Sequence, residues 1–189
     1  MMDVLAELLL TISTAFLVPV ILLLLLFFAL TVVYVGGLAA ETLSRRRYAR
    51  RFREFVMRLK ASPNQKTRME DVPAVGGFPK KAFTTHAVDR AKLIDDLQLE
   101  SEQALGRLML GIRLGPILGL AGTLIPLGPA LVALSTGDVS TLSAKLVVAF
   151  TTTVLGLLVG GVCFAMHSVR RRWYMQDLND IEFVMKRME

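Results

Sequence analysis

The sequence is poor in the side chains from which most catalytic and metal sites are built. Its 189 residues include two histidines and a single cysteine, Cys163. One cysteine excludes an intramolecular disulfide and a multi-cysteine metal site. There is no Ser-His-Asp candidate, no HExxH motif and no GxxxxGK[ST] loop. We therefore expect a protein that is not an enzyme, with no metal site and no cofactor, and we interpret Cys163 as a small buried residue.

Carboxylates are absent from three long stretches of the chain. These runs, about 11–40, 112–134 and 144–166, are mainly apolar. Each can cross a hydrocarbon core of ~30 Å, which takes about 20 helical residues. Hydrophobic residues make up 53% of the chain, and its mean hydropathy is +0.54. The pattern predicts an all-α membrane protein with three transmembrane helices and long cytoplasmic helical extensions.

Lysine and arginine are absent from the first ten residues, and no small-residue cleavage site follows them. The first run is therefore predicted to be a retained helix rather than a signal peptide. Basic residues instead gather after the first and third runs, which predicts that these ends are cytoplasmic and that the N-terminus is outside. We interpret the net charge of +6 as a topology signal and as contact with anionic lipid of the cell membrane, not as a nucleic-acid site. The clusters are Arg45, Arg46, Arg47, Arg50, Arg51, Arg53, Arg58 and Lys60, and then Arg170, Arg171 and Arg172.

The rest of the chain is expected to follow from these runs. Pro19 is expected to kink the first helix, and the prolines and glycines between 61 and 83 predict a loop. A helix capped by Thr84 or Thr85 is expected to continue into the second span, with His86 solvated at its start. The predicted segments are a short outer N-terminal segment (1–10), transmembrane helix 1 (11–40), cytoplasmic helices and a loop (41–111), transmembrane helix 2 (112–134), an outer turn (135–143), transmembrane helix 3 (144–166) and a cytoplasmic C-terminal helix (167–189).

Apolar stripes predict that the cytoplasmic helices pack on one another. The predicted stripe residues are Leu43, Phe52, Phe55, Val56 and Leu59 in the first extension, Ala91, Ile94, Leu97, Ala104, Leu105 and Leu108 in the second, and Leu178, Ile181, Phe183, Val184 and Met188 in the tail.

Small residues recur at helical spacing in the second and third spans. Gly111, Gly115, Gly119 and Thr123 form one row, and Ala149, Thr153, Gly156 and Gly160 form another. Rows of this kind let helix backbones approach closely in lipid, where packing drives association. The three prolines of the second span predict bends, with two readings open: they shape packing, or they mark irregular backbone beside a water-accessible cavity. These prolines are Pro116, Pro126 and Pro129.

The spans offer hydroxyls where an ion pathway would ordinarily have an ionisable group. Thr123 lies in the second span, and Thr151, Thr152 and Thr153 lie in the third. A hydroxyl can order water or coordinate an ion without a buried charge. The alternative is that these hydroxyls bond only to the backbone or to a neighbouring helix.

Two sequence segments resemble the MotA/TolQ/ExbB family of ion-channel subunits, in its three-span ExbB/TolQ branch. The segment Pro116-Ile-Leu-Gly-Leu-Ala-Gly-Thr123-Leu is similar to the family's PLLGLLGTV segment, and Thr153-Val-Leu-Gly-Leu is similar to its ATAIGL segment. The order of spans, cytoplasmic loop and C-terminal helix fits as well. Pro126 departs from the family's usual glycine, and Val148 stands where ExbB-like proteins often carry a membrane glutamate.

The resemblance implies a homopentamer whose second and third spans line a central pore. This pore would hold the membrane helices of a single-span ExbD/TolR/MotB-like partner, whose aspartate carries the ion. Thr123 and Thr153, with Thr152 beside them, would form the ion pathway, and ion flow, of H⁺ or Na⁺, would drive a molecular motor acting on the envelope. The alternative function is a non-conducting membrane scaffold that recruits partners through its cytoplasmic helices. A solute transporter is disfavoured because no inverted repeat is present.

Overall fold

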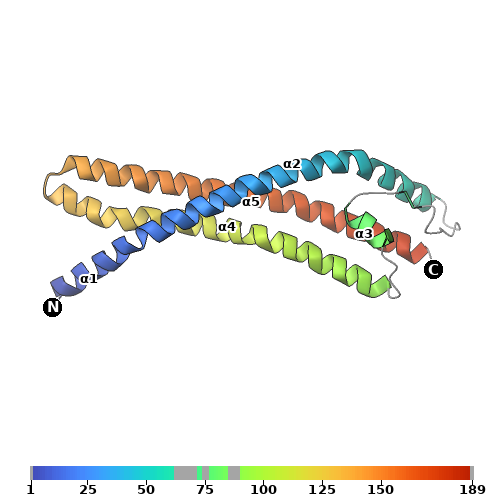
Figure 1. Ribbon diagram of the computed structural model, residues 1–189, viewed down its shortest axis with the longest axis horizontal. Helices are drawn as coiled ribbons and strands as arrows, with labels where there is room; N and C mark the ends of the chain where they lie inside the picture. The colour runs from blue at the N-terminus through green and yellow to red at the C-terminus, as the bar shows by residue number, and fades with distance from the viewer. Residues whose placement is uncertain (1, 62–71, 74–76, 85–89, 188–189) are drawn as a thin grey trace. The chain divides into compact units, whose positions relative to one another are not determined.

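The structure is a computed structural model that describes residues 2–61, 72–73, 77–84 and 90–187. Within these ranges all regular structure is helical (Figure 1). The elements are α1 (Met2–Ala15), α2 (Leu17–Ala61), α3 (Phe78–Thr84), α4 (Arg90–Ser135) and α5 (Val139–Arg187). The chain divides into two compact units, to both of which α2, α4 and α5 contribute. We call Met1–Tyr34 with Leu108–Ala165 the hairpin unit, and Val35–Arg107 with Met166–Glu189 the extension unit.

Three helical stretches in the described chain are long and apolar enough to cross a membrane. They are Leu10–Arg45, Lys92–Ser135 and Val139–Arg187. Each contains one of the three apolar runs, and each continues well past that run into polar sequence. The all-helical, multi-pass membrane fold predicted from the sequence is therefore confirmed.

The helical chain is interrupted once near its start, close to Pro19. Proline has no backbone N–H, so the carbonyl of Ala15 cannot accept the usual helical bond from position 19. The structure ends α1 at Ala15 and begins α2 at Leu17, with Phe16 N donating to Ile12 O at 3.3 Å and to Ser13 O at 3.1 Å. The predicted disturbance at Pro19 thus lies three residues before the proline itself. The helix α1 begins at Met2, inside the segment 1–10 that was expected to precede the membrane helix.

The prolines of the second span do not interrupt α4. Pro116, Pro126 and Pro129 all lie inside one helix that runs from Arg90 to Ser135. Of the two readings left open, irregular backbone does not fit, since the helix continues through each of them. Membrane helices tolerate such prolines where neighbouring helices pack against the freed backbone groups, and Pro126 is fully buried.

The turn between α4 and α5 is shorter than the predicted 135–143 and comprises residues 136–138. Gly137 has a φ of +76°, a conformation that favours glycine. Gly137 N donates to Leu134 O at 3.1 Å, and Asp138 N donates to Ala133 O at 2.9 Å, which is the Schellman pattern of helix termination. Asp138 then caps α5, accepting a bond at Oδ1 from Thr141 N at 3.0 Å. Hydrogen bonds from Thr141, first from its side chain and then from its backbone, lower the pKa of Asp138.

The extension unit has aromatic and aliphatic cores. One cluster centres on Phe78, Leu97, Tyr174 and Ile181, where the rings of Phe78 and Tyr174 meet edge to face with centroids 4.9 Å apart. A second cluster holds four buried residues of α2 and α5, namely Phe52, Val56, Leu59 and Val184. Phe78 belongs to α3, a helix within the segment where a loop was predicted.

The predicted stripes coincide in large part with these cores. Leu43 is the exception, because it is exposed. It precedes Phe52 by nine residues, which at about 100° per residue places it on the opposite face of α2. Thr85 and His86, together with the side chains of Thr84, Ala91 and Met188, lie outside the described residues.

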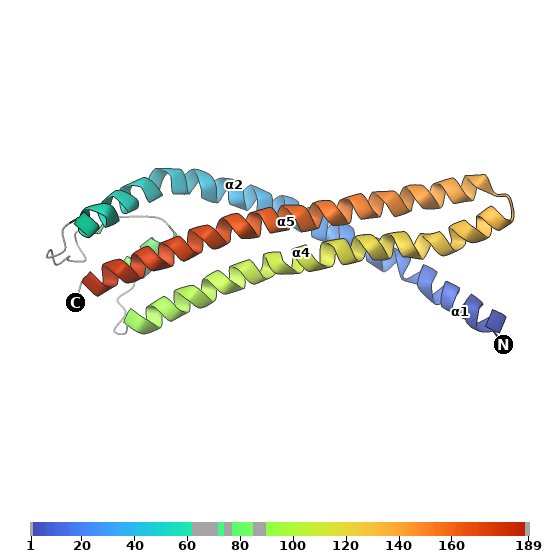
Figure 2. The same ribbon diagram turned by 180° about the vertical axis from the view of Figure 1, so that it is seen from behind.

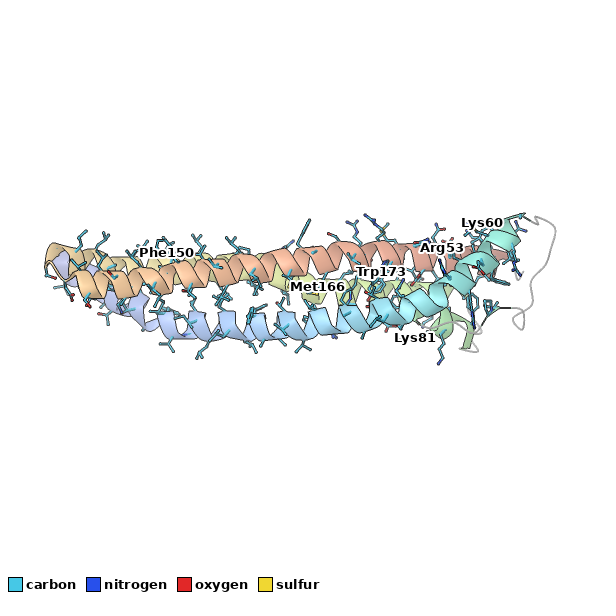
Figure 3. The ribbon with its side chains drawn as sticks, turned by 90° about the horizontal axis from the view of Figure 1, so that it is seen from above. Arg53, Lys60, Lys81, Phe150, Met166 and Trp173 are labelled. Carbon is cyan, nitrogen blue, oxygen red and sulfur yellow. The ribbon has the colours of Figure 1, made fainter. Side chains whose placement is uncertain are left out.

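Arg45 is the centre of an ion-pair network in the extension unit. Its guanidinium pairs with Asp177 through the two terminal nitrogens, and its Nε lies 3.5 Å from Glu41 Oε1. Glu41 also accepts a bond from Arg170 at 3.2 Å. The Arg45 guanidinium stands 4.9 Å above the ring of Trp173, which Figure 3 places on the side of α5 that faces α2. This network joins α2 to α5 within the extension unit.

Candidate functional site

Within the hairpin unit, α4 and α5 pack so closely that glycines of one helix meet backbone of the other. A Cβ added to Gly115 would lie 2.9 Å from Gly156 O and 3.0 Å from Gly160 N. A Cβ on Gly119 would lie 3.2 Å from Gly156 Cα. The two helices run side by side in both views of the ribbon (Figures 1 and 2). The glycines of both rows therefore lie at the contact between α4 and α5, whereas Thr123 and Thr153, the threonines of these rows, are only partly buried.

The same contact continues along the helices to Cys163. A Cβ on Gly111 would lie 3.3 Å from Cys163 Cβ, and Cys163 is buried, as the sequence predicts. Its Sγ is also 3.6 Å from Thr31 Oγ1 of α2, and Thr31 Oγ1 donates to Phe27 O at 2.7 Å. The first membrane helix thus packs on the hairpin at the level where Gly111 and Cys163 meet.

A further contact, between Gly122 and Thr152, was not singled out from the sequence. A Cβ on Gly122 would lie 2.6 Å from both Cβ and Oγ1 of Thr152. Gly122 follows Gly119 by three residues, so it lies on nearly the same face of α4. That spacing was the available signal. Thr152 is buried, and this burial comes from packing against α4 within one chain.

The three successive threonines of α5 have three different surroundings. Thr151 is exposed, Thr152 is buried and Thr153 is partly buried. Each hydroxyl donates to a carbonyl one turn earlier: Thr151 Oγ1 to Val147 O at 2.8 Å, Thr152 Oγ1 to Ala149 O at 2.9 Å, and Thr153 Oγ1 to Ala149 O at 3.2 Å. Identical side chains with similar backbone bonds therefore sample three directions around one helix.

Thr123 of α4 and Thr153 of α5 lie on the same side of the hairpin. Gly122 faces Thr152, and each helical side chain is turned by about 100° from the one before it. Because α4 and α5 are antiparallel, moving one residue onward along each helix turns both side chains to the same side of the pair. Thr151, one residue back, points to the opposite side. Thr123 and Thr153 are then separated by about 3 Å along the helix axes, two residue rises.

The hydroxyls of Thr123 and Thr153 present acceptor lone pairs rather than protons. Thr123 Oγ1 donates its proton to Leu120 O at 2.7 Å, and Thr153 Oγ1 donates to Ala149 O. What remains on each oxygen is the capacity to accept a hydrogen bond or to coordinate a cation. Such a pair suits water, a protonated carboxyl group or a small cation.

The apolar runs of the hairpin contain no acidic side chain; Asp138, in the turn, is the one carboxylate between Gly111 and Met166. Among the described residues no group of three or more His, Cys, Asp or Glu side chains could hold a metal ion. The site therefore has polar oxygens but lacks a titratable group that could carry a proton.

Long apolar helices, a glycine-packed hairpin and hydroxyls on one of its sides define a multi-pass helical membrane protein. Residues 80–182, more than half of the chain, match the profile of the MotA/TolQ/ExbB proton channel family, and the chain belongs to this family. The match includes all of α4 and α5 as far as residue 182, and a family of channels supports a channel-type role. Comparison with curated proteins and with solved structures gives no significant match.

Proposed function

We propose that the chain is the pore-forming subunit of an ion-driven complex of the three-span ExbB/TolQ type, in which ion flow, of protons in the first instance, produces mechanical work. The observation that carries this proposal is the hairpin itself, which places Thr123 and Thr153 on one side and has no carboxylate in its apolar runs. A pathway that has acceptor oxygens but no titratable group requires that group from another chain. Membership of a proton channel family supports the same conclusion.

The missing group is supplied by a single-span partner with an aspartate in its membrane helix. When that aspartate is protonated, its O–H donates to the free lone pairs of Thr123 or Thr153. When it is ionised, the same hydroxyls order the waters that deliver the next proton. Each unit charge that moves down 100 mV releases ~2.3 kcal/mol, which the complex converts into movement of the partner.

The hairpin serves as a stiff wall of the pore. Glycines hold the backbones of α4 and α5 in contact, so the side that carries Thr123 and Thr153 keeps its spacing while a partner moves against it. Five copies arranged with this side inward form the ring. Thr152 contributes by packing against Gly122 rather than by contact with the ion.

Orientation follows from the arginine clusters. Arg50, Arg51, Arg53 and Arg58 are exposed on α2 after its apolar run, and Arg171 and Arg172 are exposed on α5 after its own. Basic residues beside membrane helices favour the cytoplasmic side. The extension unit is thus cytoplasmic, and the turn 136–138 faces outward from the cell membrane.

The adjacent threonines of α5 provide a matched test. Thr153→Val and Thr151→Val each remove one hydroxyl and one bond to a backbone carbonyl at constant side-chain shape. We expect Thr153→Val to abolish potential-driven proton uptake by proteoliposomes that contain the chain with its single-span partner. Thr151→Val should retain uptake, because Thr151 points to the other side of the hairpin.

Oligomeric state is measured on the same samples. Native mass spectrometry should give a pentamer for the wild type and for both variants. Full proton uptake by Thr153→Val in an intact oligomer would contradict the pathway and favour the non-conducting scaffold. A stable monomer or dimer in both detergent and lipid would contradict the ring.

A further inference from the structure

The extension unit contains a cavity that the proposed function does not use. Its volume is about 730 Å³, within the range of roughly 300–1,000 Å³ in which proteins bind small molecules. The walls come from α2, α3, α4 and α5, and all of the lining residues belong to the extension unit. Trp173, Arg53 and Lys81, labelled in Figure 3, are three of them. A molecule bound here would therefore contact four helices of one unit.

One part of the wall is aromatic. It is formed by Phe52 of α2, Phe78 of α3, and Trp173 and Tyr174 of α5. The rings of Phe78 and Tyr174 already pack edge to face, so this wall is held in place without a ligand. Aromatic rings pack on one another by stacking or by edge-to-face contact. The wall therefore favours a ligand that has an aromatic body.

Two hydrogen-bond donors in the aromatic wall are without a partner in the part of the chain that the structure describes. Tyr174 is only 8% exposed, yet its hydroxyl makes no hydrogen bond to a described residue, and neither does the indole N–H of Trp173. Buried polar groups are normally hydrogen-bonded. A phenol keeps its proton at neutral pH and an indole N–H only donates. An acceptor oxygen inside the cavity would satisfy these donors.

The charges in the wall leave one cation without an acidic partner. Arg53 Nη2 donates to the neutral Oε1 of Gln176 at 3.1 Å, and within the described ranges Arg53 pairs with no carboxylate. A guanidinium has five N–H donors and binds phosphate oxygens in pairs. The carboxylates that line the cavity are instead all paired with cations of the chain, as Glu41–Arg45, Asp177–Arg45, Asp180–Lys60 and Glu100–Lys81.

We propose that this cavity binds a small organic phosphate with an aromatic body. Its phosphate oxygens accept hydrogen bonds from the Arg53 guanidinium and the Tyr174 hydroxyl, and its ring packs against Phe78 and Trp173. A phosphate monoester carries a charge of about −1.5 to −2 at neutral pH and three acceptor oxygens, so it can serve donors on two helices at once. The site lies in the extension unit and does not depend on ion flow through the hairpin unit.

The test uses the full chain in phosphatidylcholine nanodiscs and two soluble probes, phenyl phosphate and methyl phosphate. Both are phosphate monoesters, and only the first has a ring. Trp173 is the single tryptophan of the chain, so its fluorescence reports occupation of the cavity, and isothermal titration calorimetry gives the Kd. We expect phenyl phosphate to bind with a Kd on the order of 1 mM or below, about tenfold tighter than methyl phosphate because its ring is buried.

Three variants locate the binding. Arg53→Gln and Arg51→Gln remove the same charge from the same helix, but Arg51 is exposed and is not part of the cavity wall. Arg53→Gln should weaken phenyl phosphate binding about tenfold or more, since a hydrogen bond to a charged group is lost, and Arg51→Gln by less than about twofold. Tyr174→Phe keeps the ring and removes the hydroxyl, and should weaken binding about three- to tenfold.

Three results overturn the proposal. Equal weakening by the two arginine variants shows that overall positive charge, and not the cavity, attracts the phosphate. Equal affinity of the wild type for phenyl phosphate and methyl phosphate shows that the aromatic wall takes no part. Absence of phenyl phosphate binding at about ten times the expected Kd shows that the cavity does not take this ligand, and is the result expected if a second copy of the chain fills it.

Discussion

The hairpin unit and the extension unit draw on the same three long helices but hold them together in opposite ways. In the hairpin unit, Gly115, Gly119 and Gly156 bring the backbones of α4 and α5 into contact. In the extension unit, helices are joined by large side chains, such as Arg45 with Asp177 and Phe78 with Tyr174. The hairpin unit therefore depends on the lack of side chains at its glycines, and the extension unit depends on contacts between large side chains.

Solvent explains this difference. In a membrane there is no hydrophobic driving force for association, because lipid tails are as apolar as the side chains. Helices therefore associate through close packing, which small residues allow. The threonine hydroxyls of the hairpin accordingly bond within their own helix. In the proposed orientation the extension unit lies outside the membrane, where burial of aromatic rings stabilises contacts and ion pairs add to it. Adding a methyl group should therefore damage the hairpin unit, whereas deleting a side chain should damage the extension unit.

The largest effect is expected from one methyl group at Gly156. Its Cβ would lie 2.6 Å from Gly115 O and 2.7 Å from Gly119 Cα. Both are backbone atoms of α4, so the helices must separate. We expect Gly156→Ala to destabilise the hairpin by about 3 kcal/mol, the upper part of the range for overpacking. SDS titration of the chain in mixed micelles measures the loss.

Gly161→Ala is the matched control for this variant. Gly161 is on the same helix, and a Cβ there meets nothing within 4 Å. Replacing a helical glycine by alanine in open space stabilises a helix by about 0.5–1 kcal/mol. Equal stability losses for the two variants would show that the backbone contact does not hold the hairpin together.

The next effect concerns Arg45 in the extension unit. Arg45→Ala leaves Asp177 and Glu41 without their shared cation. Breaking a buried ion pair costs about 3–5 kcal/mol, and side-chain exposures of 20% for Arg45 and 17% for Asp177 lower the expected cost to about 2–3 kcal/mol. The chain has one tryptophan, and Arg45 stands over it. The fluorescence of Trp173 therefore reports unfolding around the Arg45 network.

Arg51→Ala is the control, because Arg51 is exposed on the same helix and should change stability by less than about 0.5 kcal/mol. Arg45→Lys should fall between the two, since lysine keeps the charge but loses the paired geometry of the guanidinium. An Arg45→Ala chain as stable as Arg51→Ala would mean that the network contributes nothing.

The long helices could be predicted because each contains a long apolar run or an apolar stripe, such as Phe52, Val56 and Leu59. The helix α3 was missed for a physical reason. Its sequence follows Gly76-Gly77 and includes Pro79, so local preferences indicate a loop. Its seven residues are stabilised by contacts with distant residues, such as the ring of Tyr174 against Phe78. A short helix of this origin has little local signal.

The candidate site was accessible to sequence reasoning up to the register between helices. Spacing shows that the three threonines of α5 face three directions, and it indicated Thr153 as the one in the small-residue row, whereas Thr152 is the one that faces α4. That assignment depends on how α4 and α5 align, which the structure fixes through Gly122 opposite Thr152. The same alignment decides that Gly122 belongs to the contact and that Thr123 and Thr153 share a side.

A smaller effect should come from exchanging sizes across that alignment. Gly122→Ala places a methyl group 2.6 Å from Thr152 Cβ and should cost about 1–3 kcal/mol. Thr152→Gly alone opens a gap and loosens the helix. The double variant restores one small and one larger residue, so the two costs should not add. We expect a favourable coupling of about 1–2 kcal/mol in a double-mutant cycle, measured by SDS titration. Additive costs would contradict the alignment.

The smallest effect belongs to Asp138, which lies in the turn between α4 and α5 and caps α5. Hydrogen bonds from Thr141 hold its pKa below the ordinary value of 3.8. A depressed pKa in the folded chain means that the carboxylate stabilises the turn at pH above the pKa of the unfolded chain. This contribution is lost as the pH falls through the pKa of the folded chain.

Asp138→Asn keeps an acceptor for Thr141 N and removes the titration. The stability difference between wild type and Asp138→Asn should therefore be constant from pH 7 to about pH 5 and shrink below about pH 4, in pH-dependent unfolding followed by circular dichroism. Asp138→Ala, which removes the cap itself, should be less stable than Asp138→Asn at low pH, where the carboxyl group of the wild type is neutral. A stability difference that is unchanged down to pH 2 would show that folding does not lower the pKa of Asp138.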